Sequence, residues 1–596
     1  MSADTGNLIS RIYGNFRGVD FRGEDVNLSR SPDAVNVWKD YREIESIRTR
    51  PLKHLFWIAH YSPSNGGFKP VYGFFFFKDK MFIHQDNVLY YHDMKSNKAI
   101  PHYLSYDMNP ASSMFFAYGD GLYIIDGKNY LLYDDTRDLL TAVTPYVPTT
   151  TIGRNPAGGG TVHEDVNLLS DRRINTFLGD GKSTDYFLDA YGETYDNTDM
   201  IVKVNDVVLT QGKDYSYMAN DAGDMVGVTF TTAPAAPLTD GQDNVSVEFT
   251  RKVAGNKEKI LGCTLLQVFD NRVFVSGNPD YPNTVWHCSL NSPGYFSDLD
   301  YYQEGTDSAA ITGLVAGNNA LWVFREPSST NTNVFYHTPT IDDEYGKIYP
   351  SVHSSITTGC IGKAINFNDD IVFFSRRGME GISGDVTTEQ AVAHRSTVVD
   401  RKLLAEANYK NMILEEWEGY LLVIIDNKIY LADSRAVFTN VDHMEYEWFY
   451  WEFDRKISCA KVYNGALYWI DDQGMIRVMS SSGENLYALG DQYAARYVNC
   501  ASHWVTPKDK FNAPHKLKTT NKRGCVVEAT GDITVSAKVE DTDFEPIGSY
   551  ENVTDYFVSR IKRKKWKDIQ LKFSSETRFS LETATLEAFI GGYIKR

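Results

Sequence analysis

The sequence predicts an all-β protein, a β-propeller with an inserted β-sandwich and a C-terminal β-sandwich. Three observations support this fold class. The 596 residues include 38 tyrosines and 32 phenylalanines, which favour strands, and 44 glycines, which favour tight turns. A hairpin pattern recurs at intervals of 40 to 51 residues, and a single interval of 151 residues interrupts it. A chain of this length is expected to hold several compact units rather than one.

The repeat consists of an apolar strand, a short polar turn, a second strand rich in aromatic residues, another turn and a third strand. Asp-, Asn- and Gly-containing pairs suit the first turn of each repeat, because tight hairpins need positive φ at their central residues. These turns fall near Asp79, Asp120, Asn271, Asn319, Asp369, Gly419 and Gly465. Seven such units predict seven propeller blades, with six or eight as alternatives, and an irregular pair of β-sandwiches is the competing interpretation.

The long interval and the two ends of the chain complete the predicted organisation. Residues 171–250 contain alternating strands, such as Met200 to Val204 and Val245 to Phe249, which indicate a small β-sandwich looped out between the second and third blades. Long strands with one apolar face follow residue 484. Along the chain, we therefore predict an extended arm and first strands at 1–52, blades at 53–160, the inserted sandwich at 161–255, further blades at 256–484 and the C-terminal sandwich at 485–596.

Composition and motifs exclude several classes of function. A net charge of −18 argues against a protein that grips nucleic acid, although it suits a surface past which DNA slides. The six cysteines are scattered without a CxxC pair, and the histidines show no HExxH, so we expect no metal site and no cofactor. No apolar run reaches the length of a membrane span and the N-terminus lacks a secretory signal, so we expect synthesis in a cytoplasm.

No catalytic constellation is predicted. The acidic residues that stand out are in hairpin turns, where Asp is favoured for local hydrogen bonding. The string GDGKST from Gly179 lacks the leading glycine of a phosphate loop, and its flanks predict strand, turn and strand rather than strand, loop and helix. No nucleophile elbow is present either, so we predict that the protein is not an enzyme.

Two basic stretches are candidate interaction sites. In the arm, Arg17, Arg22 and Arg30 can make forked contacts with the carboxylates of an acidic partner. Gly14, Gly18 and Gly23 would let the extended chain bend closely along other backbones. Near the C-terminus, a strand through Ser559 to Phe573 would place Arg560, Lys562 and Lys564 on one face with Trp566 nearby. That face would meet DNA, an acidic neighbouring subunit or only solvent.

Several of these segments resemble one protein family. The arm, with Phe16 to Asp20, then Ala34, Asn36 and the pair Arg50 and Pro51, is similar to the N-terminal signature of phage tail-nozzle proteins, also called tail tubular protein B. Leu52 stands where that signature has a glycine. The inserted unit resembles a β-sandwich module of phage tail and fibre proteins, with Asp206 in place of a common glycine. The segments HWVTP from His503 and LEAFIGGYIKR from Leu586 resemble the last domain of such tail proteins.

The resemblance implies a structural role in the virion. Nozzle proteins of short-tailed phages form a ring, typically a hexamer, below the portal and adaptor rings, where the ring closes and then conducts the genome channel. The implied partners are further copies of this chain, the adaptor or portal-side ring proteins, tail fibre proteins, and duplex DNA that passes through the lumen without specific binding. Like-charge repulsion from an acidic lumen would let DNA pass without being trapped.

Two other functions stay open at the level of sequence. A propeller enzyme that depolymerises host glycans would need converging carboxylates and exposed aromatic residues, such as Trp322, Trp417 or Trp469. A receptor-binding or fibre-attachment tail protein would use the inserted sandwich as its adhesive unit. For the arm itself, we predict packing over the propeller and the C-terminal domain, or against a neighbouring subunit, rather than a domain of its own.

Overall fold

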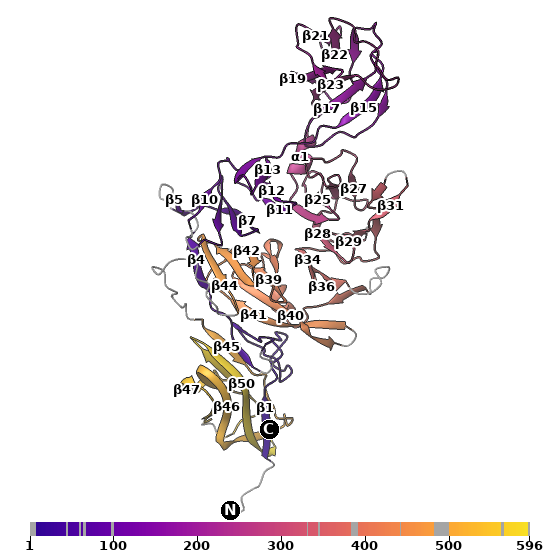
Figure 1. The fold of residues 1–596 in the computed structure, drawn as a ribbon. Helices are drawn as coiled ribbons and strands as arrows, with labels where there is room; N and C mark the ends of the chain where they lie inside the picture. The colour runs from indigo at the N-terminus through magenta and orange to yellow at the C-terminus, as the bar shows by residue number, and fades with distance from the viewer. Residues whose placement is uncertain are drawn as a thin grey trace, which may run out of the picture. The chain divides into compact units, whose positions relative to one another are not determined.

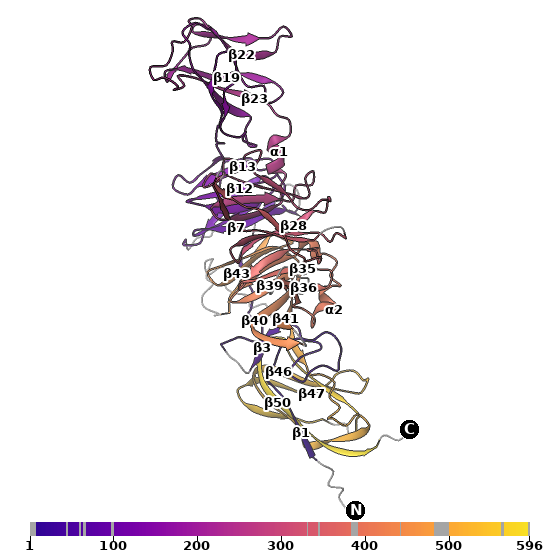
Figure 2. The ribbon, with the colours of Figure 1, turned by 90° about the vertical axis from the view of Figure 1, so that its right-hand side faces the viewer.

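A computed structural model describes most of the chain in two compact units. The described residues are 8–42, 46–58, 61–62, 67–96, 100–329, 332–343, 346–382, 391–440, 443–481, 500–561 and 565–593. The first unit comprises Met1–Gln85, Tyr90–Tyr103 and Ser354–Arg596, and the second comprises Asp86–Leu89 and Leu104–His353. Strands dominate both units (Figure 1; Figure 2), which confirms the predicted all-β class.

The chain is a β-propeller whose described residues include seven four-stranded antiparallel sheets. The first three blades are β7 (Val71–Phe77), β8 (Lys80–Gln85), β9 (Val88–Asp93) and β10 (His102–Tyr103); β11 (Met114–Tyr118), β12 (Gly121–Ile125), β13 (Tyr130–Asp134) and β14 (Leu139–Ala142); and β24 (Leu265–Phe269), β25 (Arg272–Ser276), β26 (Thr284–His287) and β27 (Tyr301–Gln303).

The next three blades are β28 (Ile311–Gly317), β29 (Ala320–Arg325), β30 (Val334–His337) and β33 (Ser351–His353); β34 (Ala364–Phe367), β35 (Asp370–Ser375), β36 (Gly378–Ile382) and β37 (Val392–His394); and β38 (Ile413–Trp417), β39 (Tyr420–Ile425), β40 (Lys428–Asn440) and β41 (His443–Glu452). The minor elements are the hairpins β5 (Tyr61–Ser62) with β6 (Gly67–Phe68) and β31 (Thr340–Asp342) with β32 (Gly346–Ile348), the helices α1 (Asn256–Leu261) and α2 (Asp400–Leu403), and the 3₁₀ turn η3 (Tyr409–Asn411).

The seventh blade contains a strand from the other end of the chain. β42 (Ile457–Tyr463), β43 (Ala466–Asp471) and β44 (Met475–Met479) come from the last repeat, and β4 (His54–Ile58) pairs antiparallel with β44, from His54 opposite Val478 to Ile58 opposite Met475. This pairing covers the edge of β44, which would otherwise expose unpaired backbone groups.

The predicted hairpin turns are present in all seven repeats. In each repeat, the first turn joins the first two strands that the repeat contributes to its blade. Each of these turns holds at least one residue with positive φ. Asn318 and Asn319, for example, have φ of 53° and 58° between β28 and β29. Consecutive residues with positive φ form the turn whose twist matches that of paired strands, and Asn, Asp and Gly tolerate this conformation best. The turn residues therefore determine where each blade folds back.

The inserted domain consists of two sheets that enclose one small core. The larger sheet has the order β16 (Thr161–Val162), β15 (Thr149–Arg154), β17 (Arg172–Phe177), β23 (Val245–Arg251), β19 (Tyr195–Val204) and β20 (Val207–Val208), and the smaller has β18 (Asp185–Phe187), β22 (Met225–Phe230) and β21 (Tyr215–Ala219). β15 runs parallel to β17, so the sheet begins before residue 161, where the sequence placed the boundary. The core includes Phe177, Phe230 and Phe249.

The C-terminal sheet has nine strands among the described residues and divides into two layers along its longest strand. The strands are β1 (Leu8–Tyr13), β2 (Val37–Trp38), β3 (Ile47–Thr49), β45 (Ser502–Val505), β46 (Lys516–Val539), β47 (Glu545–Val553), β48 (Tyr556–Ser559), β49 (Ile569–Ser575) and β50 (Phe579–Tyr593). β46 pairs with β50 as far as Gly531 and with β49 from Thr534. Gly531 has φ of +91°, and a Cβ there would lie 2.3 Å from the carbonyl oxygen of Arg578, so the bend between the layers requires glycine.

Candidate assembly site

The N-terminal arm lies between the sixth blade and the C-terminal sheet, and it bonds to both. On the blade side, the backbone N–H of Val19 donates to the carbonyl of Trp448 (2.7 Å) and that of Asn36 to the carbonyl of Tyr450 (2.9 Å). On the other side, β1 pairs along its whole length with β50, and β3 also pairs with β50. The arm is therefore built into the first unit as three strands and a connecting segment, not as a separate domain. We call this segment, residues 14–36 between β1 and β2, the strap.

Gly18 allows the strap to approach the blade. Its φ is +79°, and a Cβ at this position would lie 2.2 Å from the carbonyl oxygen of Trp448. Any other residue would displace the strap from the strand to which Val19 bonds. Gly14 has its closest neighbour at 3.5 Å and Gly23 has none within 4 Å, so among the three glycines singled out from the sequence only Gly18 meets another backbone closely.

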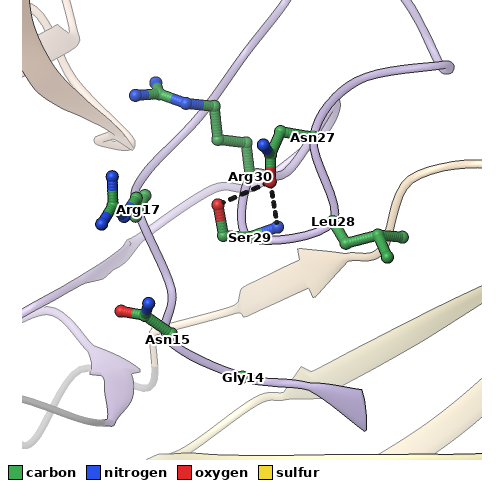
Figure 3. Close-up of a pocket in the computed structure, with 7 residues that line it drawn as sticks. All are labelled: Gly14, Asn15, Arg17, Asn27, Leu28, Ser29 and Arg30. Atoms are coloured by element: carbon green, nitrogen blue, oxygen red, sulfur yellow. Dashed lines mark hydrogen bonds between the residues drawn. The ribbon is translucent and has the colours of Figure 1, made fainter. Parts of the chain in front are cut away.

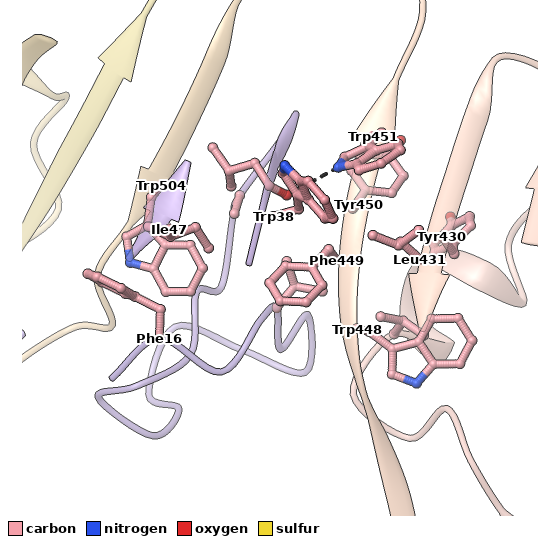
Figure 4. Packing of buried hydrophobic residues seen from close by; sticks show 14 of the residues in the cluster. Phe16, Trp38, Ile47, Tyr430, Leu431, Trp448, Phe449, Tyr450, Trp451 and Trp504 are labelled. Carbon is pink, nitrogen blue, oxygen red and sulfur yellow. Dashed lines mark hydrogen bonds between the residues drawn. The ribbon is translucent and has the colours of Figure 1, made fainter. Parts of the chain in front are cut away.

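Aromatic side chains fill the space between the strap, the blade and the C-terminal sheet (Figure 4). The ring centroid of Trp38 lies 5.4 Å from that of Trp417, 5.5 Å from that of Tyr420 and 6.0 Å from that of Trp451. The Trp451 indole N–H donates to the carbonyl of Val37 (3.2 Å). On the side of the C-terminal sheet, Phe16 packs edge-on against Trp504 at 5.0 Å. These rings belong to one continuous core, so each of the three segments is stabilised by packing against the other two.

Asn36 ties the same three segments together with hydrogen bonds. Its amide group donates to the carbonyl of Ala501 (2.9 Å), while its Oδ1 accepts from Arg50 Nε (3.0 Å) and from the backbone N–H of Glu452 (2.8 Å). Arg50 is buried and its guanidinium carbon lies 4.1 Å from the centroid of the Phe453 ring; burial lowers its pKa. Ala34 is fully buried as well. The motif residues Ala34, Asn36 and Arg50 thus have structural roles at the junction.

The three arginines predicted as contact residues in the arm differ in their surroundings. Arg17 is half-exposed, and its Nε lies 3.9 Å from Glu447 Oε1. Arg22 forms a two-pronged pair with the buried Asp20, with Nε to Oδ1 at 2.9 Å and Nη2 to Oδ2 at 2.7 Å. Arg30 is buried, which lowers its pKa. The forked arginine–carboxylate contact is therefore made by Arg22 within the arm itself.

Glu447 is the most perturbed carboxyl group under the strap. Burial raises its pKa from 4.5 to about 7, against the opposing effect of nearby Lys39, Arg30 and Arg17. Its Oε2 has no hydrogen-bond partner among the described residues. A carboxyl group in this setting is favoured in its protonated form in the folded state, so we expect the attachment of the strap to weaken as the pH rises toward 7.

Two cavities flank the loop of the strap from Arg22 to Arg30. One, of about 510 Å³, is lined by Gly14, Asn15, Arg17, Asn27, Leu28, Ser29 and Arg30 (Figure 3). The other, of about 630 Å³, lies on the side of Asp20 and Glu24. Asn27 Oδ1 accepts hydrogen bonds from the backbone N–H and the hydroxyl of Ser29 (3.0 and 2.9 Å), which shape the loop. The first cavity has the arginines Arg17 and Arg30 and no acidic residue in its lining, whereas the second has both arginines and acidic residues.

Of the C-terminal candidates, Arg560 and Trp566 lie outside the named strands, between β48, which ends at Ser559, and β49, which begins at Ile569. Arg560 is exposed, and Lys562 and Lys564 lie outside the described residues. Trp566 is fully buried; its indole N–H donates to Thr520 Oγ1 (2.9 Å) and its ring packs against Phe511 at 5.3 Å. Trp566 is thus a core residue, which sequence proximity to lysines did not reveal.

Other sites considered from the sequence have structural explanations. Asp180, in the string GDGKST, accepts hydrogen bonds from the backbone N–H groups of Lys182 and Ser183 (2.8 and 2.7 Å), which is a local turn between strands. Trp322, Trp417 and Trp469, the candidate sugar-binding rings, are all buried. Among the described residues no group of three His, Cys, Asp or Glu could hold a metal ion. The six cysteines are free thiols.

Comparison with known proteins shows no family for this chain. No family model and no curated protein matches the sequence. Among solved structures, BamB from Moraxella catarrhalis is 11% identical with a TM-score of 0.30, covering 68% of this chain and 96% of that one. YCF48, solved bound to D1 peptide, is 8% identical (TM-score 0.30, 73% and 99% covered), and the Pan2 WD40 domain of Neurospora crassa is 10% identical (0.26, 74% and 96%). Within the described residues, no helix has the length and apolarity to cross a membrane.

Proposed function

We propose that this protein is a structural component of a phage tail and forms an oligomeric nozzle or stopper ring that closes and conducts the genome channel. One observation carries the proposal. The arm residues that resemble the nozzle signature, Gly18, Val19, Ala34, Asn36 and Arg50, are those that bind the strap to the sixth blade and the C-terminal sheet. A junction of this kind suits a protein whose work is mechanical, because it holds several segments of the chain in one core.

The distribution of charge supports the same role. Residues 1–499 contain 43 Lys and Arg against 65 Asp and Glu, so most of the subunit repels phosphate. A channel of such subunits would let duplex DNA pass without holding it, since each phosphate contact by a cation adds affinity and slows transit. The partners of the proposed ring are further copies of the chain, adaptor or portal-side ring proteins, and tail fibre proteins. Its place is the virion, after synthesis in the host cytoplasm.

Electron microscopy and mass photometry of the purified full chain test the proposal. Closed rings with a central channel, of six copies or a similar number, are the expected result, together with the protein's presence in purified virions. A chain that stays monomeric at every concentration and is missing from virions would remove the proposal.

Truncation of the arm adds a second test. Removing residues 1–30 would uncover the core, because Phe16, Val19 and Phe21 are buried. Deleting only the residues up to Tyr13 removes strand β1 and leaves the strap. This shorter truncation is expected to impair ring formation while the blades keep their thermal unfolding transition. Loss of that transition would mean that β1 serves folding rather than assembly.

A further inference from the structure

His394 contacts two carboxylate groups at once, one through each of its ring nitrogens. It is the last residue of β37, in the fifth blade. Its Nδ1 lies 3.2 Å from Glu380 Oε1, directly across on the neighbouring strand β36, and its Nε2 lies 2.6 Å from Asp400 Oδ2, at the start of α2. An ionised carboxylate only accepts hydrogen bonds, so a ring with a carboxylate at each nitrogen carries a proton on both. The geometry therefore calls for the positively charged imidazolium form.

The two carboxylates depend on this charge to different degrees. Glu380 is buried, and its Oε1 also accepts a hydrogen bond from Arg377 Nε at 2.9 Å. Asp400 accepts a further bond only from an uncharged group, the hydroxyl of Ser396 (2.6 Å), and no other cation pairs with it among the described residues. Loss of one ring proton would leave two carboxylates on a neutral ring, with a second cation for Glu380 alone.

The same contacts set the pH at which the ring loses this proton. Burial by itself would lower the pKa of His394, but hydrogen bonds and charge from Asp400 and Glu380 outweigh burial and raise the pKa from 6.5 to about 9. The adjacent charged residue on the same strand, Arg395, pairs with Asp370 (2.8 Å). Because the folded-state pKa is raised, the stabilisation is complete below pH 6.5 and is lost as the pH rises through about 9.

The segment that follows His394, residues 395–402, holds the strap. The carbonyl of Val398 accepts the backbone N–H of Phe21 (2.8 Å), and Lys402 Nζ lies 3.9 Å from the centroid of the Phe21 ring. Phe21 and Val398 are buried in the core that the strap shares with the blades. The place of Phe21 therefore depends on how firmly this segment is anchored to the fifth blade.

We propose that His394 is a proton-dependent positioning residue, which anchors the strap to the fifth blade when its ring is charged and releases it in base. The charged ring joins β36, β37 and the start of α2. After deprotonation, the partly exposed Asp400 turns to water, because no other cation holds it. Residues 395–402 then lose their anchor, and the contact with Phe21 weakens. The device acts within one chain, so it does not depend on the proposed ring.

Hydrogen–deuterium exchange of the purified full chain tests the proposal through the protection factor of the peptide that contains Phe21. The factor is compared at pH 8 and pH 10, because Glu447, with a pKa of about 7, is already ionised at pH 8. Burial lowers the pKa of Lys402, which titrates toward the same range. The comparison is therefore made in a Lys402→Arg parent, which keeps a cation over the Phe21 ring at both pH values.

The expected result is a fall of about tenfold in the protection of Phe21 in the parent from pH 8 to pH 10. The protonated fraction of a group with a pKa of about 9 falls by about that factor over these two pH units. His394→Gln is uncharged and should show the low protection at both pH values. His394→Arg keeps a cation with several donors and should show the high protection at both. The control His102→Gln changes an exposed histidine of the first blade and should behave as the parent.

Three outcomes would overturn the proposal. The first is equal protection of Phe21 in the parent at pH 8 and pH 10, which needs no variant of His394. The second is parent-like protection in His394→Gln at pH 8. The third is a fall in His394→Gln between the two pH values as large as in the parent, because another group would then carry the proton. Each of these results leaves the proposed ring untouched, which mass photometry tests separately.

Discussion

The arm junction and the inserted domain differ in how their cores relate to the propeller blades. At the arm junction, tryptophan, tyrosine and phenylalanine rings from three distant segments form one core with the sixth blade. Inside the inserted domain, the fully buried Arg173 donates to the carbonyl of Arg251 (2.8 Å) and Asn175 donates to Asp189 (2.8 Å), and toward the third blade the Tyr191 hydroxyl donates to Asp298 (3.1 Å). The inserted domain has its own separate core. The C-terminal sheet should therefore unfold together with its blades, and the inserted domain should unfold independently.

Substitutions in the two cores test this difference most directly. Trp38→Ala removes one of the indole rings of the arm junction and is expected to cost about 3–5 kcal/mol of unfolding free energy, as large core truncations do. Phe230→Ala in the inserted core should cost a similar amount. Differential scanning calorimetry is expected to show that the first variant lowers the transition of the propeller with the C-terminal sheet. The second should lower only a separate transition of the inserted domain.

A conservative variant controls the first substitution. Trp38→Phe keeps an aromatic ring, and the indole N–H of Trp38 has no hydrogen-bond partner among the described residues, so no such bond is lost. We expect Trp38→Phe to lose well under half as much stability as Trp38→Ala. A single transition that both Trp38→Ala and Phe230→Ala lower equally would show that the two regions unfold as one, against the comparison above.

Gly18 tests the hydrogen-bonded part of the arm junction. Gly18→Ala forces a Cβ to within 2.2 Å of the Trp448 carbonyl oxygen and imposes a φ that alanine disfavours. The expected loss is about 2–4 kcal/mol, from strain and from the bond between Val19 and Trp448. Gly23→Ala is the matched control, because nothing lies within 4 Å of Gly23, and it should change stability by less than about 1 kcal/mol. Equal effects of the two variants in urea unfolding would contradict the role of Gly18.

Glu447 makes the arm junction sensitive to pH. Its pKa is about 7 in the folded state and 4.5 ordinarily, so the folded state favours the protonated carboxyl group. Its contribution is fully present below pH 4.5 and is lost as the pH rises to about 7. Glu447→Gln should remove this dependence and raise the free energy of unfolding at pH 8 by roughly 2–3 kcal/mol relative to wild type, with little change at pH 4.5. Urea unfolding of the wild type and of Glu447→Gln at pH 4.5 and pH 8 measures this effect. If the two proteins differed in unfolding free energy by the same amount at both pH values, Glu447 would not be the source of the pH dependence.

The turn residues made much of the fold predictable from the sequence, whereas pairings between different segments of the chain were not predicted. The seven blade turns were predicted because Asn, Asp and Gly determine a turn within four residues. β4 completes a blade by pairing with β44, which lies more than 400 residues further along the chain, and no local pattern signals such a partner. The parallel pairing of β15 with β17 was also missed. In the site, Gly18 was singled out correctly, but the burial of Arg30 and Trp566 depends on tertiary packing that a charge pattern does not encode.

Arg22 provides the smallest test, at the exposed rim of the arm junction. Its guanidinium holds both carboxylate oxygens of the buried Asp20, and it is itself half-exposed. Solvent screens the pair, so Arg22→Ala should cost only about 0.5–1 kcal/mol. Arg22→Lys should recover little, because an ammonium group cannot make the two-pronged contact. If Arg22→Ala strongly weakened ring formation while it lowered the free energy of unfolding only by this small amount, Arg22 would contact a neighbouring subunit as well as Asp20. If both measurements changed together and by little, Arg22 would serve only to satisfy the carboxylate that the strap buries.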